Sequence, residues 1–204
     1  MAKNILVLEG TALWAKVFEP DTKFNPLGDY SINLQMPVAQ AAAMSEQLDQ
    51  IVQAKFNEAV KADPRLKNTL TTQDVCQPVF DRETGDDTGN VEFKFKLKAK
   101  VQKRDGTYYE QQPAVLDSKK VPMTNDILIG NGSRVKVAFE PIPYVMASTK
   151  KAGVSLRLKA VQVIDLVEYG NSAASVFDEE DGFVAPPATE AANSTEELAD
   201  VADF

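Results

Sequence analysis

Alternating apolar and polar residues dominate the first 165 positions and predict a series of short β-strands. The expected strands cover residues 5–8, 12–18, 30–36, 91–101, 133–139 and 154–164. One segment differs, because from Ala41 to Val60 apolar residues recur every three or four positions, and Pro37 and Pro64 flank it. This spacing predicts one amphipathic helix. Residues 65–90 are polar and rich in turn-forming residues, and they predict a long surface loop.

The composition changes after residue 170. No Lys or Arg follows Lys159, and residues 171–204 hold nine acidic residues among many Ala, Ser, Asn and Pro residues. So few apolar residues do not offset the entropy of ordering the segment. We therefore predict an all-β domain with one helix over residues 1–170, followed by a disordered acidic tail over residues 171–204.

The charge is distributed unevenly along the chain. The formal net charge is −8, yet residues 91–159 contain 14 basic and 6 acidic residues, a local net charge of +8. A basic segment combined with an acidic end is typical of a nucleic-acid-binding protein that carries an interaction tail. With no histidine and a single cysteine, Cys76, the chain lacks the usual zinc ligands and the commonest general base. We expect no enzyme activity, no metal and no cofactor.

No run of about eighteen apolar residues could span a bilayer, and the first ten residues do not resemble a secretory signal. We therefore expect a cytosolic protein without a membrane partner.

The clearest alternation runs from Val91 to Val101 and separates an apolar face from a basic one. The basic face carries Lys94, Lys96, Lys98 and Lys100. Alternate strand residues lie about 6.6–6.8 Å apart, a spacing that matches successive phosphates of an extended single strand. An alternative role for these lysines is to protect an exposed edge strand from pairing with another chain.

Two further strands add basic residues, and several aromatic residues are candidates for base stacking. Arg134 and Lys136 alternate with apolar residues in one strand, and Arg157 and Lys159 do so in another. The aromatic candidates are Trp14, Phe18, Tyr108, Tyr109 and Tyr144. Trp14 could instead pack in the core, whereas Tyr144 follows two prolines and is expected in a stiff loop.

Several short motifs follow one another in the order and spacing of a known family. They are Phe93-Lys-Phe-Lys96, Val115-Leu-Asp-Ser-Lys119, Ile129-Gly-Asn-Gly-Ser133, Val135-Lys-Val137, Pro143-Tyr144 and the strand from Val154 to Leu166. Together with the acidic tail that ends in Asp203-Phe204, these motifs resemble the replication single-stranded DNA-binding proteins of short-tailed coliphages.

The resemblance implies an OB-type five-stranded barrel, sequence-independent binding of single-stranded DNA, annealing of complementary strands, and a homodimer in the cytoplasm of an infected bacterium. It also implies roles in DNA replication, recombination and repair, with the viral DNA polymerase and helicase-primase contacted through Asp200, Asp203 and Phe204. The DNA-contacting positions that it implies are Lys3, Trp14, Lys94, Lys96, Arg134, Lys136 and Tyr144, to which the strand pattern adds Lys98 and Lys100.

Two positions depart from the family pattern. Leu27 stands where the family has an arginine, and Met146 stands where it has a tryptophan. These departures imply a shifted DNA path or weaker binding, for which Lys98 and Lys100 could compensate. A different hypothesis is that the protein is a structural or assembly component of a virion and uses its basic face and acidic tail for contacts between copies.

Overall fold

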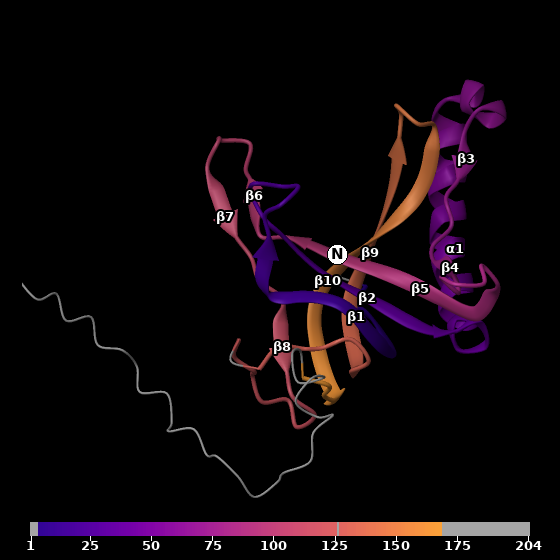
Figure 1. The fold of residues 1–204 in the computed structure, drawn as a ribbon. Coiled ribbons are helices and arrows are strands. Elements are labelled where there is room, and N and C mark those ends of the chain that lie inside the picture. Colours follow the sequence, from indigo (N-terminus) through magenta and orange to yellow (C-terminus); the bar gives the residue numbers. More distant parts are fainter. Residues whose placement is uncertain (1–3, 126, 169–204) are drawn as a thin grey trace, which may run out of the picture.

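Five long strands close into a barrel in the computed structural model, which describes residues 4–125 and 127–168 (Figure 1). The barrel strands are β1 (Leu6–Asp21), β2 (Asp29–Pro37), β5 (Asp87–Lys98), β9 (Arg134–Met146) and β10 (Lys151–Asp165). Their order is β10-β9-β1-β2-β5, and parallel pairing of β10 with β5 closes the ring. The predicted five-stranded OB-type barrel with one helix is confirmed.

The barrel interior is filled by the apolar members of the alternating strands. Ile32 and Leu34 of β2, Phe93 and Phe95 of β5, and Phe139 of β9 are completely buried. The rings of Phe95 and Phe139 lie 5.0 Å apart at a tilt of 58°, a favourable aromatic arrangement. Because successive strand residues point to opposite faces, this packing turns the lysines of β5 outward.

Helix α1 (Val38–Ala62) connects β2 to the segment before β5 and lies on the outside of the barrel (Figure 1). Its buried Val52 packs with Leu70 and Ala152, and Ala152 belongs to β10. The predicted amphipathic helix between Pro37 and Pro64 is confirmed, and the 3₁₀ helix η1 (Pro64–Asn68) follows Asp63. No helix within the described residues has the length and apolar character needed to cross a membrane.

Strand β1 is one long strand, whereas the sequence predicted two short strands over residues 5–8 and 12–18. A side chain at position 10 would place its Cβ 2.9 Å from the Met36 side chain and 3.1 Å from the Gln35 carbonyl oxygen of β2. Glycine therefore permits close approach of the neighbouring strand here. The register of β1 against β2 shifts instead at two places, between Leu13 and Lys16 and between Lys16 and Asp21.

The prediction of a long loop over residues 65–90 is wrong in part. Strand β3 (Thr71–Thr72) pairs with β10, and β4 (Gln77–Phe80) pairs with β5. Strand β4 lies at the end of the strand order and is mostly exposed, so it lacks the apolar alternation that would have revealed it. It also contains Pro78, a residue that sheets tolerate at their edges.

The expected strand from Val91 to Val101 is interrupted at Ala99. Strand β5 ends at Lys98, and β6 (Lys100–Gln102) forms a separate two-stranded sheet with β7 (Tyr108–Glu110). The chain bends because the Ala99 N–H donates to the Gly28 carbonyl oxygen, 2.8 Å away in the β1–β2 connection. The short β8 (Ala114–Leu116) then pairs with β10.

Tyr144 also lies in a different setting from the one predicted. Pro141, Pro143 and Tyr144 are part of β9 rather than a loop, and they pair with β10. Proline is tolerated where its missing N–H is not needed for the sheet, so the two prolines do not end this strand.

Candidate nucleic-acid interface

The outer surface of β5 carries three lysines that we call the lysine face: Lys94, Lys96 and Lys98. They are exposed and alternate with buried Phe93, Phe95 and Leu97. Their partners on β2 are Asn33, Ser31 and Asp29 respectively. None of the three forms an ion pair with another described residue. The lysine face therefore presents three ammonium groups that form no ion pair with any described carboxylate.

The nearest acid on the same strand is engaged elsewhere. Glu92 accepts a hydrogen bond from the Asn33 side-chain amide, with an N–O distance of 2.9 Å. Strand β5 pairs with β2 along one side and with β4 and β10 along the other. Protection of an exposed edge strand therefore does not explain the lysine face, because β5 is not an edge strand.

Neighbouring strands extend the basic surface on both sides of Lys96. Lys16 of β1 lies opposite Ser31, Ser31 lies opposite Lys96, and Arg157 of β10 lies beside Lys96. Arg157 is 3.8 Å from Glu140, whereas Lys16 forms no ion pair with a described residue. Lys16 was not among the predicted site residues, because its position across Ser31 from Lys96 depends on strand register.

Trp14 stands at the bulge of β1 and is 58% exposed, so it is not a core residue. Its φ of 52° is unusual for a bulky side chain. The Asn131 side-chain oxygen accepts a hydrogen bond from the Trp14 N–H at 2.8 Å and holds this conformation. Bulges commonly redirect a side chain, and this one turns the indole toward solvent. Asn131 lies in the motif Ile129-Gly-Asn-Gly-Ser133 but was not among the predicted site residues.

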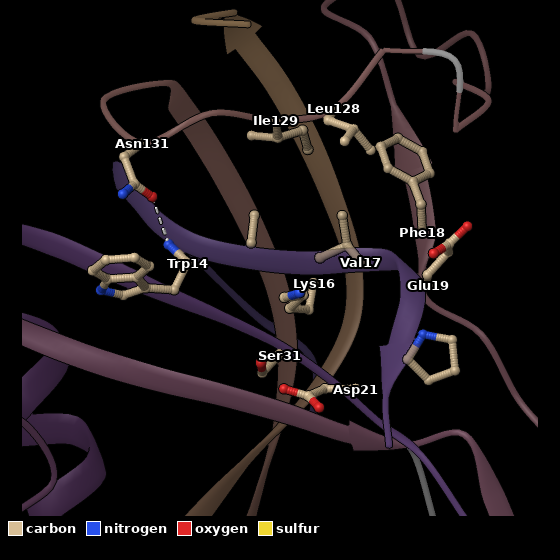
Figure 2. A pocket seen from close by; sticks show the side chains of 12 residues that line it. Trp14, Lys16, Val17, Phe18, Glu19, Asp21, Ser31, Leu128, Ile129 and Asn131 are labelled. Atoms are coloured by element: carbon tan, nitrogen blue, oxygen red, sulfur yellow. Dashed lines mark hydrogen bonds between the residues drawn. The ribbon is translucent and has the colours of Figure 1, made fainter. Parts of the chain in front are cut away.

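A cavity of about 460 Å³ lies between β1 and the segment before β9. Figure 2 shows Trp14 at one end of it, Phe18 and Leu128 at the other, and Lys16 with Ser31 below β1. Phe18 is only partly exposed and packs against the core, so its ring lines the cavity and does not offer an open face for base stacking. Apolar walls with a few polar groups at the rim suit a planar, polar ring.

Tyr144 is held rigidly on the outer side of β9. A Cβ atom at Gly153 would lie 2.7 Å from the Tyr144 hydroxyl oxygen, so any larger residue there would displace the ring. The hydroxyl donates a hydrogen bond of 2.9 Å to the side-chain oxygen of Gln73. Its neighbour Val145 faces the opposite way and packs toward α1. Met146 and Leu27, the two departures from the family pattern, are exposed.

The structure does not join Arg134 and Lys136 to the lysine face. Arg134 forms ion pairs with Asp165 at 2.7 Å and Glu9 at 3.1 Å, and Lys136 lies 3.5 Å from Glu9. The hydrogen bond and charge of Asp165, and then Glu9, raise the pKa of Arg134. In the barrel, β10 separates β9 from β5 on one side, and β1 and β2 separate them on the other.

Lys100 is also separated from the lysine face, because it belongs to β6. It forms a 2.9 Å ion pair with Glu110, which raises the pKa of the Lys100 ammonium group. Tyr108 and Tyr109 of the same hairpin are both exposed. The remaining predicted site residues, Lys3 and the tail positions Asp200, Asp203 and Phe204, lie outside the described residues, as does the predicted tail itself.

No described group of His, Cys, Asp or Glu residues could hold a metal ion. Cys76 is half-buried, and its sulfur lies 3.7 Å from the Ser45 hydroxyl.

Comparison with known sequences gives consistent matches. Residues 10–166 match the sequence model of the family described as "Single-stranded DNA-binding protein, Bacteriophage T7". The single-stranded DNA-binding protein of Escherichia phage T7 is 31% identical over 186 residues, which cover 85% of this chain and 78% of the relative. That of Enterobacteria phage T3 is 30% identical over 171 residues, with coverage of 76% and 70%.

Solved structures share the fold. The crystal structure of gp2.5, a single-stranded DNA-binding protein encoded by bacteriophage T7, matches with a TM-score of 0.66 and 28% identity, over 91% of this chain and 100% of that one. The single-stranded DNA-binding protein from bacteriophage Enc34 in complex with single-stranded DNA matches with a TM-score of 0.52 and 13% identity, over 80% and 88%. At that identity, the Enc34 likeness shows the fold alone. The match over residues 10–166 and the two phage relatives show that the chain belongs to the family of the bacteriophage T7 single-stranded DNA-binding protein.

Proposed function

We propose that this protein binds single-stranded DNA without sequence preference during phage DNA replication. The observation that carries the proposal is the lysine face, whose three ammonium groups have no ion-pair partner among the described residues on a strand that is paired on both sides. Its support from relatives is that the T7 and T3 proteins are single-stranded DNA-binding proteins.

The chemistry of the face explains binding without sequence preference. Ammonium groups contact phosphates, which every nucleotide carries, and release the counterions condensed on the strand. In an OB-fold, the surface of the second and third barrel strands commonly holds the oligonucleotide. Here those strands are β2 and β5, so the lysine face is in the expected place.

Aromatic side chains supply the second part of the proposed interaction. Trp14 is turned outward by the bulge, and Tyr144 is fixed by Gly153 and Gln73. Each base stacked on such a ring contributes about 1–3 kcal/mol, and every base has a face to stack. A rigid ring loses little conformational entropy on binding, so fixing Tyr144 in advance favours affinity.

Arg134, Lys136 and Lys100 contribute differently in this proposal. Each is already paired with a carboxylate, so a phosphate must compete with Glu9, Asp165 or Glu110. These pairs are largely exposed, and exposed pairs are worth only about 0–1 kcal/mol. Phosphate can therefore displace the acids, at a lower gain than at the lysine face. We assign Lys3 the same phosphate-binding role on the strength of the family resemblance.

The wider role that we propose is that of a replication and recombination protein in the cytoplasm of an infected bacterium. It coats and protects single strands, promotes annealing and acts as a homodimer. Its acidic tail, through Asp200, Asp203 and Phe204, recruits the viral DNA polymerase and the helicase-primase. The support is the resemblance together with the nine acidic residues after position 170. The proposed function is binding, and it assigns no catalytic step to any residue.

A titration of Trp14 fluorescence with oligonucleotides tests the proposal, because Trp14 is the single tryptophan and is exposed beside the basic surface. We expect saturable binding to strands of any base composition, with affinity that falls steeply as salt rises. Retention of the protein on a single-stranded DNA column, lost when salt is added, would distinguish this function from a structural role in a virion. Failure of the full-length protein to bind the column or the oligonucleotides would overturn the proposed function.

A further inference from the structure

The β6–β7 hairpin projects from the end of the strand that carries the lysine face. Three hydrogen bonds fix its base. Ala99 N–H donates to Gly28, Gln111 N–H donates to the Ala99 carbonyl at 2.9 Å, and the Gln111 side chain donates to the Lys98 carbonyl at 2.8 Å. Figure 1 shows the hairpin beside the β1–β2 connection and away from α1. It is therefore continuous with the proposed DNA-binding surface.

The hairpin exposes two adjacent aromatic side chains that pack against no core. Tyr108 is 51% and Tyr109 is 43% exposed. Their cross-strand partners are Gln102 and Val101 respectively, so the two rings point to opposite faces of the hairpin. Strand propensity accounts for tyrosine in a hairpin, and the Tyr109–Val101 pair adds a little stability. Neither effect requires an aromatic ring on each face.

The tip of the hairpin is basic, and its acids are occupied. Lys103 and Arg104 are exposed and form no ion pair with a described residue. The Asp105 carboxylate instead accepts hydrogen bonds from the Thr107 hydroxyl at 2.6 Å and the Thr107 N–H at 2.9 Å, which lowers the pKa of Asp105. Asp105 stays charged while it closes the turn, so Lys103 and Arg104 together leave the tip with a net charge of +1.

We propose that the β6–β7 hairpin is an additional contact for single-stranded DNA beyond the barrel, in which Tyr108 and Tyr109 offer stacking surfaces and Lys103 and Arg104 contact phosphates. This inference rests on the proposed function and deepens it. The five residue steps from Lys100 to Asp105 extend at most about 17 Å, the length that they would have at the rise of a strand. That length accommodates roughly two to five nucleotides, depending on how far the strand is stretched.

The test compares full-length wild-type protein with the double variant Tyr108→Thr/Tyr109→Thr across oligothymidylates of increasing length. Threonine retains strand propensity, so the hairpin is expected to persist. We expect equal affinities for the shortest strands that bind. For strands several nucleotides longer, we expect the double variant to bind about 5- to 150-fold more weakly, the effect of losing one stacked base. The matched control, Tyr108→Phe/Tyr109→Phe, retains both rings and should bind like wild type at every length.

A charge variant tests the second half of the proposal. Lys103→Ala/Arg104→Ala should reduce the slope of log affinity against log salt by about 1.4 for long strands and leave it unchanged for short ones. Equal affinity of the threonine variant and wild type at every length would overturn the hairpin proposal while leaving the proposed function standing. An equal loss at all lengths would also overturn it, because the substitutions would then act through the barrel. Failure of wild type itself to bind would refute both proposals together.

Discussion

Removal of two lysines from the lysine face should change how DNA binding depends on salt. In the variant Lys94→Ala/Lys96→Ala, two ammonium groups without ion-pair partners among the described residues are lost, so no carboxylate is left unpaired. Both side chains are exposed and their neighbours Phe93 and Phe95 stay buried, so we expect the fold to persist.

The magnitude follows from counterion release. Each phosphate contact contributes about 0.7 to the slope of log affinity against log salt for single strands, so the double variant should lose about 1.4. Between about 50 and 200 mM salt, the ratio of wild-type to variant affinity should then fall about sevenfold. The loss should be the same for strands of different base composition, because phosphates carry no sequence information.

Fluorescence titration of Trp14 at four or more salt concentrations provides the measurement, with thermal unfolding as a check on the fold. The matched control is Lys61→Ala/Lys119→Ala, which removes the same charge from the end of α1 and the turn after β8. The control should retain the wild-type slope. An unchanged slope in the folded Lys94/Lys96 variant, or an equal reduction in the control, would refute the assignment of phosphate contacts to the lysine face.

Three further predictions concern other parts of the interface. Gly153→Ala should displace the Tyr144 ring, because the new Cβ would lie 2.7 Å from its hydroxyl oxygen. Titration should then show DNA binding weakened by about 1–3 kcal/mol, the contribution of one stacked base. Wild-type affinity in this variant would contradict the stacking role of Tyr144. Glu9→Gln should raise DNA affinity modestly at low salt, because it releases Arg134 from one of its two acidic partners. Unchanged DNA affinity would mean that the Arg134–Glu9 pair has a purely structural role. Deletion of residues 184–204 should raise DNA affinity at low salt, because a tethered polyanion no longer competes for the basic surface; equal affinity at low salt would contradict tail competition.

Much of the fold was predictable because alternation and helical spacing are local signals. A period of two residues separates Phe93 and Phe95 from Lys94 and Lys96 whatever the partner strands are, and burial of the phenylalanines confirms this. The same reasoning failed where one local signal has two physical meanings. The gap expected between the strands at residues 5–8 and 12–18 is continuous strand, in which Gly10 permits a close approach of β2. The prolines before Tyr144 indicated a loop but lie in β9.

The sequence by itself therefore determined the faces of the strands, the single helix and the uneven distribution of charge. Only the tertiary structure decided which basic groups have acidic partners. Arg134 meets Glu9, 125 residues earlier in the chain, because β9 pairs with β1 in one particular register. Lys96 meets Ser31 and Arg157 instead, because β5 lies between β2 and β10 in the closed barrel. The alternation of apolar and polar residues predicts to which face of a strand a side chain points. Strand order and register decide which residues lie next to that side chain, and both are set when the barrel closes around its core.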